Sequence, residues 1–105
     1  MDPRDNISIS YLKSMNLKKS FQTDLTERVR RVTNDFTKSI FINQFEDIAS
    51  EYAYEMCKEF KDKSDFITPA IRDYLIGEVC DAIGERTPNF GSVRPNVFDR
   101  VRRRI

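Results

Sequence analysis

Residues 41–60 read FINQFEDIASEYAYEMCKEF, and we expect the rest of the chain to pack around them. Their large apolar residues recur every three or four positions, a spacing that places them on one side of an α-helix. These residues are Phe41, Phe45, Ile48, Tyr52, Met56 and Phe60. Small residues that would let a second helix come close lie beside them, at Ala49, Ala53 and Cys57. The opposite side is rich in Glu and Asp, so we expect it to face solvent.

A second helix is predicted before residue 41. Asp24 is a suitable N-cap residue, and Glu27 follows three positions later, as in a capping box. Apolar residues then recur at helical spacing, at Leu25, Val29, Val32, Phe36 and Ile40. This apolar side is out of phase with the one that begins at Phe41, so residues 39–43 form either a turn or part of one continuous helix. We favour a continuous helix that bends near residue 40, because no Gly or Pro marks a turn there.

The signals for a further helix are strong after residue 60. A short charged loop leads to Thr68, a good N-cap residue, and to Pro69 at the first helical position, where proline is favoured. Apolar residues follow at Ile71, Leu75, Val79 and Ile83. Gly84 is a natural C-cap. Gly77 costs the helix about 1 kcal/mol relative to Ala, and we ascribe it to the close approach of a neighbouring helix.

The two ends of the chain are less regular. Residues 1–9 are polar and include a proline, so we expect a flexible or extended arm, followed by a short helix from Ser10. Near the other end, residues 85–95 contain two Pro and a Gly, and Phe90 and Val93 would hold this loop against the bundle. Asn96 would then cap a short C-terminal helix, with Val97 and Val101 on its apolar face.

These segments predict an all-α fold, a small bundle of four main helices plus a short C-terminal helix. A chain of 105 residues has room for one domain with a modest core, so residues 1–105 form a single helical domain. No apolar run approaches the ~20 residues of a membrane span, and the first residues lack the apolar segment of a secretory signal. We therefore expect a soluble, cytoplasmic protein without a membrane partner.

The sequence lacks the commonest catalytic residue and shows no catalytic motif. It contains no histidine and no glycine-rich phosphate loop, and its two cysteines, Cys57 and Cys80, are far apart. We expect both thiols to be reduced and buried. Glu51 and Glu55 share a helix face and are able to hold a cation, but such acidic runs are usually a solvated face. We therefore predict no enzyme, no metal and no cofactor.

Charge is unevenly distributed although the net charge is only +1. Residues 41–83 carry ten acidic and four basic residues, whereas residues 84–105 carry six arginines and two acids. The densest basic segment is RVRRR, residues 100–104. Its arginines suit phosphate contacts with nucleic acid, but they equally suit pairing with the acidic side of residues 46–59, within one chain or between chains.

For the function we expect a non-enzymatic protein–protein interaction module: an adaptor, an inhibitor or an assembly subunit. Complementary charged surfaces would bind a protein partner or a second copy of the chain in a homodimer. The alternative is a nucleic-acid-binding regulator that uses the C-terminal arginines. Tyr54 joins the candidate surface because exposed tyrosines are enriched at interfaces. The full candidate surface comprises Arg28, Arg30, Arg31, Lys38, Arg100, Arg102, Arg103, Arg104, Glu51, Tyr54 and Glu55.

Overall fold

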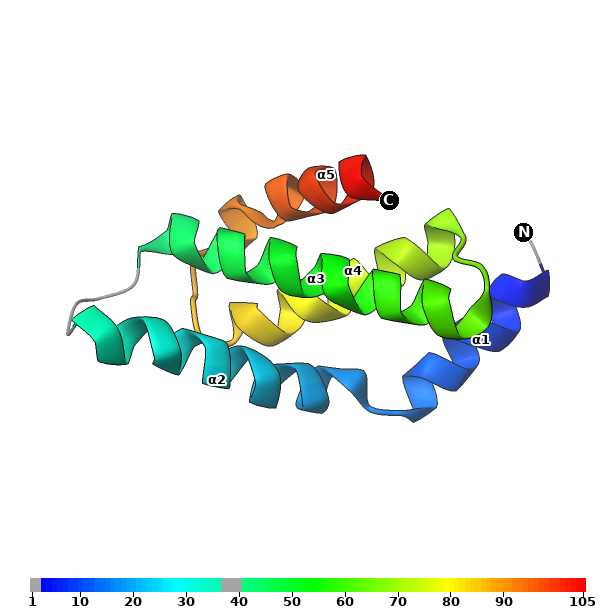
Figure 1. Ribbon diagram of the computed structural model, residues 1–105, viewed down its shortest axis with the longest axis horizontal. Helices are drawn as coiled ribbons and strands as arrows, with labels where there is room; N and C mark the ends of the chain where they lie inside the picture. Colours follow the sequence, from blue (N-terminus) through cyan, green and yellow to red (C-terminus); the bar gives the residue numbers. More distant parts are fainter. Residues whose placement is uncertain (1–2, 37–40) are drawn as a thin grey trace.

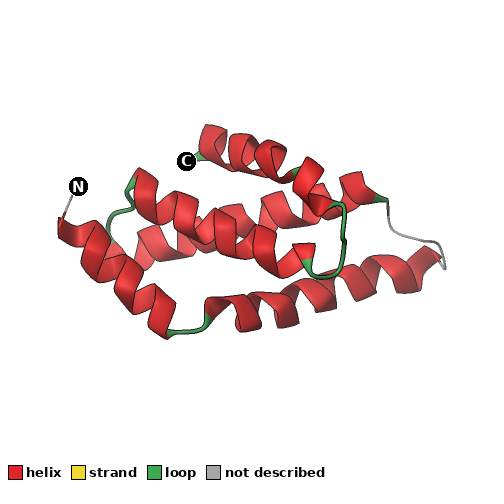
Figure 2. Cartoon of the chain, turned by 180° about the vertical axis from the view of Figure 1, so that it is seen from behind, coloured by secondary structure: helices red, strands yellow, loops and turns green. Residues whose placement is uncertain are grey.

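The computed structural model describes residues 3–36 and 41–105, and within these ranges it contains helices and no strand (Figures 1 and 2). The prediction of an all-α bundle with four main helices and a short C-terminal one is confirmed. The elements are α1 (Pro3–Ser14), α2 (Leu17–Phe36), α3 (Ile42–Ser64), α4 (Pro69–Gly84), a 3₁₀ turn η1 (Phe90–Ser92) and α5 (Arg94–Arg104).

The centre of the bundle is α4, which contacts each of the other four α-helices. Its apolar side is broad, and seven of its side chains are buried: Ile71, Leu75, Ile76, Val79, Cys80, Ala82 and Ile83. The expectation that the chain packs around residues 41–60 is therefore wrong. Helix α3 keeps an acidic, solvent-facing side, so it covers the core from outside.

Small residues bring α3 close to its neighbours, as predicted. Ala49, Ala53 and Cys57 are fully buried, whereas Ile48, Met56 and Phe60 are only partly so. Phe41 was expected on the apolar side but is 70% exposed, because the helix begins one residue after it.

Helix α2 begins at Leu17, seven residues before the predicted start. Asn16, in the left-handed region with φ 52°, separates it from α1. The buried side of α2 follows an i+4 spacing that extends upstream of Leu25 to Phe21 and Leu17, so the signal for the earlier start was present. Asp24, predicted as the N-cap, instead accepts a hydrogen bond from the Tyr52 hydroxyl.

The expected continuous helix through residues 39–43 is wrong at Phe41, and residues 37–40 lie outside the described ranges. Phe41 has an extended backbone (φ −76°, ψ 154°), and its N–H donates to Gln44 Oε1 at 2.9 Å. Gln44 thereby satisfies a backbone donor at the start of α3.

The expected arm of residues 1–9 is a helix from Pro3 onward, and residues 1 and 2 lie outside the described ranges. Side-chain contacts to the rest of the chain explain why this segment is an ordered helix and not an arm. Asp5 is buried and accepts a hydrogen bond from the Thr68 hydroxyl, and the Arg4 guanidinium lies 4.6 Å from the centre of the Phe66 ring.

The predicted start of α4 is confirmed. Thr68 Oγ1 accepts a hydrogen bond from the Ile71 N–H at 3.3 Å, and Pro69 occupies the first turn. Helix α4 ends at Gly84, as expected, although Glu85 is the C-cap residue and its backbone is right-handed. Near Gly77, two side chains of α5 approach α4: a Cβ there would lie 3.4 Å from Arg94 Nη2 and 3.9 Å from Phe98 Cζ. These are ordinary van der Waals distances, so the approach of α5 does not require a glycine.

The last segment folds much as predicted. Phe90 is buried and holds the loop, and Val97 and Val101 are fully buried under α5. Asn96 is not the cap, because α5 already begins at Arg94 and carries Pro95 in its first turn. None of the described helices is long and apolar enough to cross a bilayer. The molecule measures 47 × 24 × 23 Å, with a radius of gyration of 14.0 Å.

Candidate interaction site

The C-terminal arginines pair with carboxylates of the same chain. Arg100 Nη1 lies 2.7 Å from Asp47 Oδ1 and 3.6 Å from Glu46 Oε1, and Arg104 Nη1 lies 2.8 Å from Glu51 Oε2. Both pairs join α5 to the acidic side of α3. They are exposed, so each contributes little to stability on its own.

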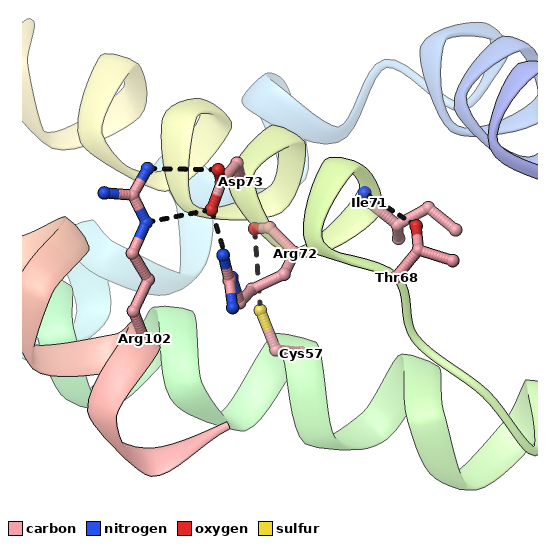
Figure 3. A network of polar contacts seen from close by, with 6 residues as sticks. All are labelled: Cys57, Thr68, Ile71, Arg72, Asp73 and Arg102. Carbon is pink, nitrogen blue, oxygen red and sulfur yellow. Dashed lines mark hydrogen bonds and ion pairs between the residues drawn. The ribbon is translucent and has the colours of Figure 1, made fainter. Parts of the chain in front are cut away.

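A second set of pairs joins α5 to α4 (Figure 3). Arg102 donates to both oxygens of Asp73, from Nε at 3.2 Å and from Nη2 at 3.0 Å, and Arg72 Nε donates to Asp73 Oδ1 at 3.1 Å. Burial alone would raise the pKa of Asp73, but the guanidiniums of Arg102 and Arg72 hold this pKa below its ordinary value of 3.8. Asp73 is therefore a charged link between two helices.

Tyr54 is covered by an arginine and is only partly exposed. The Arg104 guanidinium lies 3.6 Å from the centre of the Tyr54 ring, a cation–π contact. The candidate residues Arg100, Arg102, Arg104, Glu51 and Tyr54 thus meet along the seam between α5 and its two neighbours.

The α2 residues of the candidate surface are elsewhere. Helices α2 and α5 lie on opposite sides of α3 (Figures 1 and 2). Arg28 pairs with Glu55 and lies 4.8 Å from the Tyr52 ring centre, while Arg30 and Arg31 are exposed. Arg103 is exposed on α5, and Lys38 lies outside the described residues. The predicted residues therefore form two separate groups, and whether either group contacts a partner stays a prediction.

Glu51 and Glu55, considered as a cation site, have different partners. Glu51 reaches α5 and Glu55 reaches α2, where each pairs with an arginine. Among the described residues, acidic and cysteine side chains do not gather in a group of three or more that suits a metal ion. The two cysteines are free and buried, as predicted, and burial raises the pKa of each thiol to about 12.

An apolar groove that sequence reasoning missed lies beside α1. It has a volume of about 340 Å³ and is lined by residues of all four longer helices, among them Tyr11, Met15, Leu17, Met56 and Phe60. The charged residues that line it in the described part of the chain are Glu59 and Lys63, whose side chains pair at 2.8 Å. The groove is therefore apolar and nearly neutral.

A line of exposed apolar residues runs along α1 and one residue past its end into this groove. Ile7, Tyr11 and Met15 are 74%, 63% and 48% exposed, and they follow each other at i+4 spacing. We call these three residues the α1 ridge. The sequence contains this spacing, but the polar character of residues 1–9 and their proline led us to expect an arm there and not a helix.

Comparison with protein-family models, with curated proteins and with solved structures finds no match to this chain.

Proposed function

We propose that this chain is a non-enzymatic protein–protein interaction module that binds an apolar helical segment at the α1 ridge and the groove beside it. The observation that supports the proposal most directly is the continuity of three exposed apolar side chains with an apolar groove. Exposed apolar surface that is contiguous, and not scattered, commonly marks an interaction site.

The chemistry of the groove suits a helix. An amphipathic helix presents residues at i, i+3, i+4 and i+7 to a hydrophobic groove, and burial of this surface contributes roughly 25 cal/mol per Å². Two methionines line the groove, Met15 and Met56, and unbranched thioether side chains adapt to partners of different shape. Adaptors, inhibitors and assembly subunits all use such contacts.

Docking through the charged surfaces receives less support than docking at the groove. Intrachain ion pairs engage Arg100, Arg102 and Arg104, so a partner would have to compete with carboxylates already in place. The same competition weakens the nucleic-acid alternative. That alternative predicts salt-sensitive binding of a short mixed-sequence DNA duplex, reduced by Arg103→Ala.

The proposal is tested by selection from a displayed library of random peptides of about 16 residues, long enough for four helical turns. We expect enriched peptides to carry apolar residues at helical spacing and to bind the wild-type chain at least tenfold more tightly than the Tyr11→Glu or Met15→Glu variants, because a buried unpaired charge opposes docking. Affinities are measured by fluorescence anisotropy.

The matched control is Phe41→Glu. Phe41 is as exposed as Tyr11 but belongs to the start of α3, at the end of the molecule far from α1 (Figure 1). This variant should bind the peptides like the wild type, and circular dichroism should show unchanged helicity in all three variants. Peptides that bind the Tyr11→Glu variant as well as the wild type would contradict the proposal.

A further inference from the structure

We propose that the occupant of the groove is a second copy of this chain, docked about a two-fold axis so that Ile7 and Tyr11 of each α1 ridge enter the groove of the other copy. This inference depends on the proposed function, because it takes the groove to be a docking site. It adds the identity of the partner and the symmetry of the complex.

The shape of the patch favours a second copy. In a two-fold interface the same patch must serve both subunits, so a projecting part and a hollow must lie side by side on one molecule. Ile7 and Tyr11 project, whereas Met15, Met56 and Phe60 line the adjoining hollow. Tyr11 belongs to both parts, so no gap separates them.

The charges of the patch favour the same arrangement. Glu59 and Lys63 lie one turn apart on α3 at the edge of the groove, and both side chains are more than half exposed. When two copies of α3 run antiparallel across a two-fold axis, Glu59 of one copy faces Lys63 of the other. The Glu59–Lys63 pair within each copy then exchanges for two equivalent pairs between the copies, so no charge is left without a partner. A strongly charged partner would gain nothing from this neutral edge.

The distribution of exposed apolar side chains also favours a second copy of the chain as the partner. Among residues 4–32 and 41–105, whose exposure the structure describes, four large apolar residues are exposed, and three of them form the ridge. One association event therefore covers nearly all of this surface, and a small domain gains burial that its own core lacks. Interfaces below about 1,200 Å² are usually transient, and a patch restricted to α1 and the neighbouring groove implies a reversible dimer.

The experiment uses the full chain in sedimentation equilibrium over a wide concentration range. We expect the average mass of the wild type to rise from one copy toward two with concentration. The double variant Ile7→Ser, Tyr11→Ser should stay at one copy, and the matched control Phe41→Ser should behave like the wild type. Circular dichroism confirms that each variant is folded.

A charge exchange tests the symmetry directly. Glu59→Lys alone and Lys63→Glu alone each place like charges opposite each other, so both variants should dimerise roughly tenfold more weakly than the wild type. In an equimolar mixture of the two variants, a positive side chain of one variant lies opposite a negative side chain of the other at both contacts. The mixture should therefore regain the average mass of the wild type. A change that merely damaged the fold would not be restored by mixing.

Three results would overturn the inference: one copy at every concentration, a dimer that the ridge variant retains, or charge variants that mixing does not restore. A chain that stays monomeric but still binds selected peptides at Tyr11 and Met15 would retain the proposed function and exclude only the second copy as partner. A chain that does neither would lose both proposals.

Discussion

The Thr68 hydroxyl serves two helices at once. It accepts a hydrogen bond from the Ile71 N–H at the start of α4, and it donates to the buried Asp5 carboxylate of α1. Loss of an N-cap side chain costs about 1 kcal/mol, and a buried carboxylate left without a donor costs more. One hydroxyl therefore fixes both the first turn of α4 and the position of α1.

We predict that Thr68→Ala lowers the free energy of unfolding by about 2–3 kcal/mol, from the lost cap and the unpaired Asp5. Thr68→Ser keeps the hydroxyl and should stay within about 0.5 kcal/mol of the wild type. Urea denaturation measures both. The double variant Asp5→Ala, Thr68→Ala should cost less than the sum of the single changes. Strict additivity would show that the two side chains are not coupled.

At the scale of the element, α5 combines two buried valines with a row of exposed ion pairs. We predict that Arg100→Gln with Arg104→Gln lowers stability by about 1 kcal/mol at low salt and by much less at 1 M salt, where the Debye length is about 3 Å. Thermal unfolding at the two salt concentrations measures the difference.

Arg103→Gln is the control, because Arg103 has no carboxylate partner in the described part of the chain. It removes one positive charge from the same helix, half of the charge that the double variant removes, and should change stability by no more than about 0.5 kcal/mol. An equal loss for Arg103→Gln, or a loss that salt does not reduce, would mean that net charge or packing explains the effect, and not the pairs with α3.

Elements with local signals were predicted well, and those that depend on tertiary contacts were not. Thr68 and Pro69 predict the start of α4, and the i+4 spacing of its apolar residues predicts its length. Helix α1 has the i+4 apolar spacing of the α1 ridge, but these side chains are exposed. The contacts that hold α1 in place are those of Asp5 and Arg4 with residues more than sixty positions away. The sequence predicted which charged residues belong to the candidate surface. It did not predict that they form two groups on opposite sides of α3, because that separation follows from how the helices pack.

Three acidic groups in the core couple the stability of the whole molecule to alkaline pH. Burial raises the pKa of Cys57 and Cys80 from 9.0 to about 12. Burial, together with the hydrogen bond to Asp24, also raises the pKa of Tyr52. In the unfolded chain these groups ionise near their ordinary pKa values, while in the folded chain they stay protonated. Their contribution to stability is complete below about pH 9 and is lost as the pH rises.

We predict that the free energy of unfolding falls between pH 8 and pH 10, with each buried thiol accounting for on the order of 1 kcal/mol at pH 10. Urea midpoints at the two pH values measure the loss. Cys80→Ala removes one titrating group, so its stability should fall less steeply with pH than that of the wild type. Parallel curves for the two proteins would show that the thiol at position 80 does not contribute.

The elongated outline of the bundle has a hydrodynamic consequence. The molecule is about twice as long as it is wide, and its radius of gyration of 14.0 Å exceeds the ~13 Å typical of a compact chain of this length. Friction on such a particle is higher than on a sphere of equal mass, so a single copy elutes early from a gel-filtration column calibrated with globular standards. Elution volume alone would therefore overestimate the mass of this protein. Light scattering and sedimentation equilibrium measure the mass independently of the shape.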